Sequence, residues 1–151
     1  MQRTIISDAS CLILLDKIGH IEILNQLFGQ IVTTSVIAQE FDRPLPEWIH
    51  LQEPVDKNYQ NIIQTSVDKG EASAIALAIE LDDCLLIIDD MKGRQLAIQL
   101  GLTITGTLGV IVNAKESGFI SSVKPLLEQI KQTNFRMSDK VEQEILRKAG
   151  E

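Results

Sequence analysis

The first pattern along the chain is a short β-branched run that stops at an acidic residue. Thr-Ile-Ile lies within residues 3–7, which favours a strand there, and Asp8 follows at once. The same pattern returns at 85–88, where four apolar residues precede Asp89 and Asp90. Because a strand that is apolar at successive positions has both faces covered, this pattern predicts a parallel sheet enclosed by helices.

Strand-like and helix-like patterns alternate along the rest of the chain. Short apolar or β-branched runs predict three more strands, at 30–33, 48–51 and 103–105. Apolar positions at helical spacing predict helices at 10–15, 20–28, 35–41, 56–67, 71–79, 92–100 and 106–114, around Pro125 and after Ser138. Ser10 is expected to cap the first helix, and Ser121 or Ser122 the helix around Pro125. Residues 68–70 are expected to form a turn.

This alternation predicts the fold class, a three-layer α/β/α sandwich about a central, mostly parallel sheet. At 151 residues the chain is expected to form one domain, residues 1–151, with a C-terminal helical extension at about 119–151. In open parallel sheets the ligand site lies outside the carboxyl ends of the strands. Asp8 and the pair Asp89 and Asp90 are therefore expected at one edge of the sheet.

Acids that meet at this edge predict a cation between them. Neighbouring strands lie about 4.8 Å apart, and carboxylates held that close raise each other's pKa unless a cation intervenes. Glu40, beside the buried stripe of its helix, and Glu71, at the start of another helix, are further candidates. Each acid also has a plain structural interpretation. Asp8 could cap a helix, Asp89 with Asp90 could start one, and the two glutamates could be ordinary surface residues.

The net charge, the apolar runs and the cysteines limit what the chain is expected to bind and where it is expected to be found. The formal net charge of −7 argues against nucleic-acid binding through a broad basic surface, but it permits binding through a metal site with a few local cations. Lys69, Lys92 and Arg94 are the candidates for phosphate contacts. No apolar run reaches about 18 residues, so no membrane span is expected. Cys11 and Cys84 are expected to be buried reduced thiols, which indicates a cytoplasmic protein.

The ordered acids and their neighbours resemble one protein family, the PIN domains. The acids and their immediate neighbours carry the resemblance at 6–10, Glu40, 70–72 and 87–90. Three later stretches continue it, at 106–109, 118–120 and 135–139. The family comprises metal-dependent ribonucleases, including the VapC toxins of toxin–antitoxin pairs. The later stretches are similar to a less characterised, VapC-like prokaryotic subgroup, so the resemblance covers nearly the whole chain.

This resemblance implies roles for single residues. Asp8 matches the family's first acid, Glu40 its second, and Asp90 the acid after the fourth strand. Glu71 stands where many VapC toxins have an aspartate, and Asp89 where a threonine or serine is common. All five acids are thereby implied as metal ligands, and all except Asp89 as catalytic residues.

Two hydroxyl positions complete the comparison with the family. Ser10 matches the small hydroxyl residue near the first acid, and it would orient a metal ligand. After Thr103 and Ile104 the chain has Thr105 and Thr107 but no further acid, which departs from the family pattern. The longer side chain of Glu71 is a second departure, because it changes how far that carboxylate reaches.

The resemblance also implies a chemistry and a set of partners. Carboxylate oxygens suit Mg²⁺ or Mn²⁺, which would activate water for in-line attack on an RNA phosphodiester and leave a 5′-phosphate. The implied partners are RNA as substrate, a small antitoxin protein and a second copy of the chain in a homodimer.

Two other interpretations remain open. A receiver-like or haloacid-dehalogenase-like domain also places acids at strand ends. However, a receiver carries its acid pair after the first strand, whereas the pair here is Asp89 and Asp90, and a dehalogenase requires an aspartate where Ser10 stands. The second interpretation is a catalytically weak interaction module, which would bind an antitoxin or its own copy through the helix at 21–28.

Overall fold

The computed structural model describes residues 3–151 and places the five predicted strands in one sheet. They are β1 (Thr4–Ser7), β2 (Ile31–Thr33), β3 (Ile49–Leu51), β4 (Cys84–Ile87) and β5 (Thr103–Thr105). Their order is β3-β2-β1-β4-β5, and every pair of neighbouring strands is parallel. Because β1 and β4 are adjacent, with Ser7 opposite Ile87, the residues that follow these two strands lie at the same edge of the sheet.

Helices connect the strands in the predicted alternation. Within residues 3–151 they are α1 (Ala9–Lys17), α2 (Glu22–Phe28), α3 (Ser35–Phe41), α4 (Lys57–Ile63), α5 (Lys69–Glu80), α6 (Met91–Gln99), α7 (Thr107–Glu116), α8 (Lys124–Lys131) and α9 (Asp139–Lys148). The main difference in length is at α4, which ends at Ile63 rather than at residue 67.

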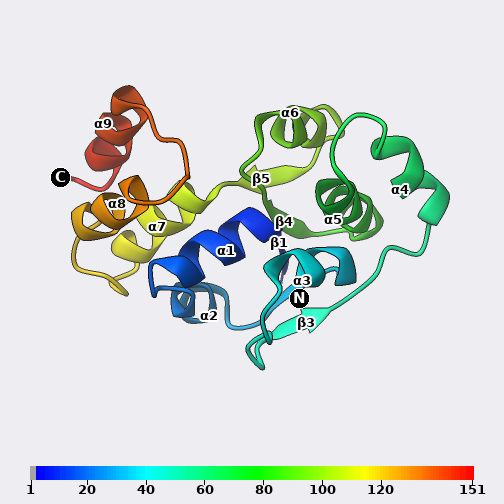
Figure 1. Cartoon of the computed structure of the whole chain (residues 1–151), viewed down its shortest axis with the longest axis horizontal. Coiled ribbons are helices and arrows are strands. Elements are labelled where there is room, and N and C mark those ends of the chain that lie inside the picture. The colour runs from blue at the N-terminus through cyan, green and yellow to red at the C-terminus, as the bar shows by residue number, and fades with distance from the viewer. Residues whose placement is uncertain (1–2) are drawn as a thin grey trace.

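The helices cover both faces of the sheet, which confirms the predicted three-layer fold (Figure 1). In this view the sheet runs from β5 at the top to β3 at the bottom, with α1, α2 and α7 on one side, α5 on the other and α6 above β5. The contacts agree, because α5 touches β1 and β4 whereas α2 touches β2 and α7. α9 contacts α7, so the last helices extend the layer that α7 belongs to.

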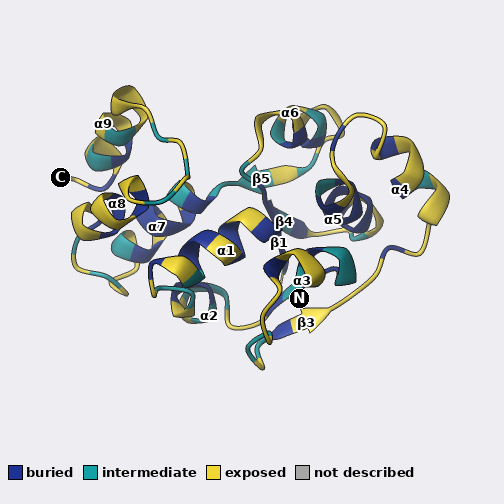
Figure 2. Cartoon of the chain, in the orientation of Figure 1, coloured by how far each residue is buried: buried dark blue, intermediate teal, exposed yellow. Residues whose placement is uncertain are grey.

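The inner strands and α5 form the centre of the core (Figure 2). Ile6 of β1 pairs with Leu86 of β4, and both side chains are fully buried. Helix α5 is buried from Ala72 to Ala78, and four alanines in this stretch allow its backbone to lie close to β1 and β4. The central strands are therefore held rigidly, and so are the residues at their carboxyl ends.

The structure corrects two predicted helix starts. Asp8, and not Ser10, caps α1, because the Asp8 side chain accepts a hydrogen bond from the Cys11 backbone N–H while Ser10 is exposed. Residues 68–70 do not form a turn, since α5 begins within them and Asp68 is its cap. In both cases the capping residue has an extended backbone and lies three residues before the N–H that it binds, which is the geometry that a cap requires.

The start of α8 is stabilised by a distant residue and not by a cap from Ser121 or Ser122. Val123 is the N-cap residue and makes no side-chain cap bond. The side-chain carboxylate of Glu151 instead accepts hydrogen bonds from the Val123 N–H at 2.8 Å and the Ser122 hydroxyl at 2.6 Å. It also pairs with the Lys115 ammonium at 3.0 Å. The Ser122 and Val123 bonds, with Lys115, lower the pKa of Glu151 to about 2.

Replacing Glu151 by Gln is expected to destabilise the fold at neutral pH but not at pH 2. Because the folded pKa of Glu151 is depressed, its stabilisation is present above about pH 4.5 and is lost as the pH falls toward 2. Thermal unfolding of both proteins between pH 2 and 7 measures this difference. Glu116→Gln, at an exposed position, is the control. A melting-temperature difference that persists unchanged down to pH 2 would contradict the assignment.

Two predictions about the whole chain can be compared with the described residues. Cys11 and Cys84 are free thiols and both are buried, as expected. Burial holds the pKa of the Cys11 thiol well above its ordinary value, so this side chain stays protonated. None of the helices within residues 3–151 combines the length and hydrophobicity needed to cross a bilayer.

Candidate active site

Asp8 lies at the centre of the candidate site, between the ends of the two central strands. It directly follows β1 and is only 3% exposed. One carboxylate oxygen, Oδ1, accepts a hydrogen bond from the Cys11 N–H at 2.9 Å. The other, Oδ2, accepts one from the Asp89 N–H at 2.9 Å, at the end of β4. The carboxylate is thus fixed by α1 on one side and by the neighbouring strand on the other.

The charged side chains that shift the pKa of Asp8, those of Asp89 and Glu71, are both acidic. Burial, the charge of Asp89 and, less strongly, the charge of Glu71 together raise the pKa of Asp8 to about 8. The two backbone N–H bonds oppose this increase without cancelling it. Since a nearby cation would favour the ionised carboxylate, this environment favours the binding of a cation.

Asp89 and Asp90 follow the same strand but differ in their contacts. The Asp89 carboxylate accepts hydrogen bonds from the Thr107 N–H at 2.8 Å and the Thr107 hydroxyl at 2.5 Å. Asp90 is exposed and caps α6 by accepting a hydrogen bond from the Gly93 N–H at 3.1 Å. The interpretation of this pair as a helix start therefore applies to Asp90, whereas Asp89 is directed toward the start of α7.

Glu71 belongs to a second group of acids at the start of α5. Burial raises the pKa of Glu71 to about 7, with further contributions from Asp68, Asp90 and Glu40. Burial and then Asp68 also raise the pKa of Glu40, whose side chain keeps an exposed surface. Because Glu71 also acts on Asp8, the two groups of acids are electrostatic neighbours.

Asp68 is a member of this second group that the sequence interpretation missed. Its side chain caps α5 by accepting a hydrogen bond from the Glu71 N–H at 2.9 Å. The signal was present, because an acid followed three residues later by glutamate has the spacing of a helix N-terminus. Asp68 was overlooked because residues 68–70 were assigned to a turn.

Gly70 allows α3 and α5 to approach each other at this point. A Cβ atom on Gly70 would collide with Glu40 Oε1, so the absence of a side chain leaves the space that the Glu40 carboxylate occupies. Nearby, the hydroxyls of Thr34, at the start of α3, and Ser73, on α5, are hydrogen-bonded at 2.7 Å. These two contacts place Glu40 beside the start of α5, although it belongs to a different helix.

Replacing Gly70 by Ala is expected to change the free energy of unfolding differently in two backgrounds. In the wild-type chain the new methyl group displaces the Glu40 carboxylate, which offsets the gain from a better helix former. In a Glu40→Ala background the collision is gone, so Gly70→Ala should stabilise the protein, by at most about 0.5–1 kcal/mol because Gly70 lies in the first turn of α5. Thermal or urea unfolding of the four proteins measures the coupling between the two positions. Equal effects of Gly70→Ala in both backgrounds would refute this account of the glycine.

The remaining predicted residues are placed as follows. Lys69 and Lys92 are exposed, and Arg94 is half-buried, with its Nη1 donating a hydrogen bond to the Ile88 carbonyl at 2.8 Å. Ser10 is exposed on α1, and its role in orienting a ligand stays a prediction.

The described acids do not form a closed ligand cluster. Within residues 3–151, no three Asp, Glu, His or Cys side chains are grouped closely enough to hold a metal ion as they stand. The chemistry of the donors nevertheless fits a hard divalent cation, because every candidate is a carboxylate and the pKa values of Asp8, Glu40 and Glu71 are raised. The negative charges of these acids raise one another's pKa values, and a bound cation would relieve this repulsion.

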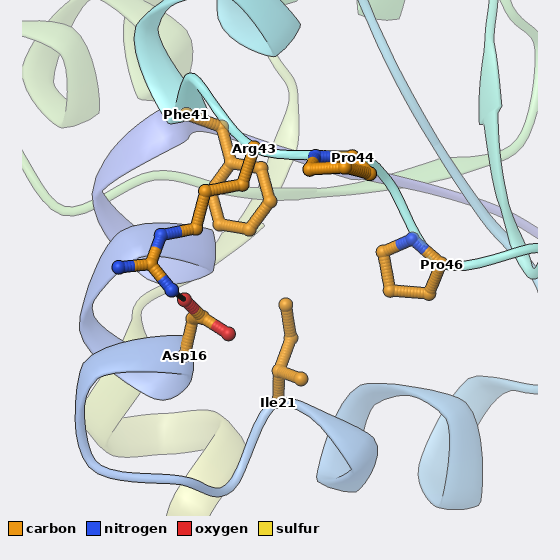
Figure 3. A pocket seen from close by; sticks show the side chains of 6 residues that line it. All are labelled: Asp16, Ile21, Phe41, Arg43, Pro44 and Pro46. Carbon is orange, nitrogen blue, oxygen red and sulfur yellow. Dashed lines mark ion pairs between the residues drawn. The ribbon is translucent and has the colours of Figure 1, made fainter.

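A hollow of about 370 Å³ lies away from these acids (Figure 3). It is lined by Asp16, Ile21, Phe41, Arg43, Pro44 and Pro46. The Arg43 guanidinium and the Asp16 carboxylate form an ion pair at 3.2 Å, and the ring of Phe41 lies behind the aliphatic part of the Arg43 side chain. None of the predicted acids lines this hollow, so it is not part of the candidate active site.

Comparison with known proteins identifies the family. A family model described as a PIN domain matches residues 4–151. No curated protein and no solved structure matches the chain. PIN domains are generally nucleases, and they typically use divalent metal ions. Because the match spans nearly the entire sequence and the parallel sheet agrees with it, this chain belongs to the PIN-domain family.

Proposed function

We propose that this protein is an Mg²⁺- or Mn²⁺-dependent endoribonuclease and a VapC-like toxin of a toxin–antitoxin pair. One observation carries the proposal. Asp8 is buried at the end of a central strand, and burial together with the charges of Asp89 and Glu71 raises its pKa to about 8. An aspartate in such an environment is costly to ionise without a cation, which a functional metal site would supply.

In this proposal the acids share one task. Asp8 and Asp90 would hold the principal ion, and Glu40 and Glu71 would complete its coordination directly or through water. When bound, the ion lowers the pKa of a water molecule and stabilises negative charge on the scissile phosphate. The buried Asp8, fixed by two backbone N–H groups, supplies the most rigid of the four carboxylates.

The substrate would be held by few cations. Lys69 and Lys92 lie exposed near the starts of α5 and α6, and they are the proposed contacts to the phosphates of the RNA. Because the net charge is −7, we expect RNA binding to depend on the metal and only weakly on salt. A protein that binds RNA through a broad basic surface would instead lose affinity steeply as salt is added.

The experiment is a Mn²⁺ and Mg²⁺ titration of the whole chain against a panel of structured and unstructured RNAs. We expect cleavage that requires the ion, is abolished by EDTA and leaves 5′-phosphate ends. Cleavage that is independent of the ion, or its absence with both ions and every RNA, would overturn the proposal.

The proposed partners are a small antitoxin and a second copy of the chain. The supporting argument is the similarity of residues 106–109, 118–120 and 135–139 to a VapC-like subgroup. A neighbouring open reading frame that encodes a small protein would identify the antitoxin. Co-expression followed by size-exclusion chromatography with light scattering would then measure both the complex and the oligomeric state.

The second candidate function is a catalytically weak interaction module. It is favoured by the absence of a closed ligand cluster within residues 3–151. Alanine at Asp8 and Asp90 separates the two functions. Loss of cleavage with partner binding intact supports the nuclease, whereas cleavage that never occurs while a partner still binds leaves the interaction module.

A further inference from the structure

Asp89 has both carboxylate oxygens committed to one residue of the next helix. Its Oδ1 accepts a hydrogen bond from the Thr107 N–H at 2.8 Å, and its Oδ2 accepts one from the Thr107 hydroxyl at 2.5 Å. Thr107 is fully buried. These contacts direct the Asp89 carboxylate toward α7, whereas the sequence resemblance implied a metal ligand at this position.

The start of α7 is built to receive this carboxylate. Its own N-cap residue, Gly106, has no side chain, so α7 has no cap bond from that position. A Cβ atom on Gly106 would lie only 2.9 Å from Asp89 Oδ1 and 2.8 Å from Arg94 Nη1. The Asp89 carboxylate therefore fills the place of a cap, where the positive end of the helix dipole also favours it.

The backbone of Asp89 faces the other way, toward Asp8. The Asp89 N–H donates to Asp8 Oδ2 at 2.9 Å, and just before it the Ile88 carbonyl accepts a hydrogen bond from Arg94 Nη1 at 2.8 Å. The chain at the end of β4 is thus held by Thr107 and by Arg94. Any movement of Asp89 moves the N–H that fixes Asp8.

We propose that Asp89 is a positioning residue and not a metal ligand: its carboxylate holds the start of α7 at Thr107, and its backbone N–H thereby fixes the Asp8 carboxylate. This inference rests on the proposed function only in naming Asp8 as a ligand. The hydrogen bonds themselves are independent of any metal ion, and they can be tested without one.

The first test uses the metal-free protein. Thr107→Val removes the hydroxyl bond to Asp89 Oδ2 and keeps a similar shape, whereas Thr107→Ser restores the hydroxyl. We expect the Asp89 amide to exchange its hydrogen about fivefold faster or more in the valine variant, with recovery in the serine variant. Thr133→Val, which removes a hydroxyl bond to the Ile130 carbonyl, is the matched control. Unchanged exchange at the Asp89 amide would overturn the proposal.

The second variant is Gly106→Ala, which serves if Thr107→Val does not fold. Its methyl group would press on Asp89 Oδ1 and Arg94 Nη1 while every hydrogen-bonding group stays in the chain. We expect the same faster exchange at the Asp89 amide. Normal exchange in this variant would also count against the proposal.

The third test separates positioning from ligation by direct Mn²⁺ binding, measured by calorimetry without RNA. A positioning residue predicts that Thr107→Val and Asp89→Asn both weaken Mn²⁺ binding by about 10–100-fold, and that Thr107→Ser recovers it. If Asp89 is a ligand, Asp89→Asn alone should abolish binding while Thr107→Val leaves it unchanged, and this outcome would overturn the proposal. So would wild-type affinity in both variants.

The failure of this inference can be distinguished from failure of the proposed function. If the wild-type chain binds no Mn²⁺ and cleaves no RNA, the proposed function is wrong, yet exchange at the Asp89 amide still tests the contacts around Thr107. If wild-type binds Mn²⁺ and cleaves RNA but the Thr107 variants leave both the exchange and the affinity unchanged, only the positioning role of Asp89 is wrong.

Discussion

Replacement of Asp8 by Asn is expected to lower Mn²⁺-dependent RNA cleavage by at least about 100-fold, which exceeds the loss typical of residues that only support a ligand. The Asp8 carboxylate accepts hydrogen bonds from the backbone N–H groups of Cys11 and Asp89. An asparagine has no negative charge, and its NH₂ group would face one of these two N–H donors. The variant therefore loses both the charge that attracts the ion and the fixed orientation of the side chain.

A matched control makes the same change at a capping aspartate outside the site, where loss of the charge should not affect cleavage. Asp56 also caps a helix, since its carboxylate accepts a hydrogen bond from the Tyr59 N–H at 3.0 Å, but it lies exposed on α4 and outside the site. Asp56→Asn should cleave RNA at the wild-type rate, while Asp8→Asn and Asp90→Asn should not. Mn²⁺-dependent cleavage that survives in Asp8→Asn would remove Asp8 from the proposed site.

In the metal-free protein, stability should fall as the pH rises from about 4 to 8, and Asp8→Asn should remove most of this slope. The folded pKa of Asp8 is about 8, well above its ordinary value of 3.8, so the folded state binds more protons than the unfolded state between these values. The stabilisation by the protonated form is complete below about pH 4 and is lost as the pH rises through 8. The pKa difference corresponds to on the order of 5 kcal/mol over the full window.

Urea unfolding in EDTA at several pH values between 4.5 and 8.5 measures this slope. Glu71, with a folded pKa of about 7, contributes in the same direction. The stability of Asp8→Asn should therefore still fall with pH, but less steeply than that of wild-type. Adding Glu71→Gln to Asp8→Asn should reduce this dependence further. Addition of Mn²⁺ above pH 7 should stabilise the wild-type chain and not Asp8→Asn, because the ion binds the ionised carboxylate. Parallel stability curves for wild-type and Asp8→Asn would contradict the raised pKa.

Local patterns along the chain were enough to predict most of the fold. β-branched runs and helical spacing identified the five strands and the alternating helices, because a buried face imposes its period on the sequence. Where the predictions failed, the reason was a cap. Asp8 and Asp68 are each the N-cap residue that precedes a helix, and a carboxylate that caps a helix looks the same in sequence as one that ends a strand or lies in a turn.

By itself, the sequence determined that acids would gather at one edge of a parallel sheet, because the strand ends of such a sheet meet there and the acids directly follow the strands. Only the tertiary structure decided what each acid touches. Asp89 is hydrogen-bonded to Thr107, which is 18 positions away in the sequence, and to Asp8, which is 81 positions away. Glu40 lies beside α5 because Gly70 has no side chain there. Such contacts depend on the packing of whole layers, and no period or spacing along the chain encodes them.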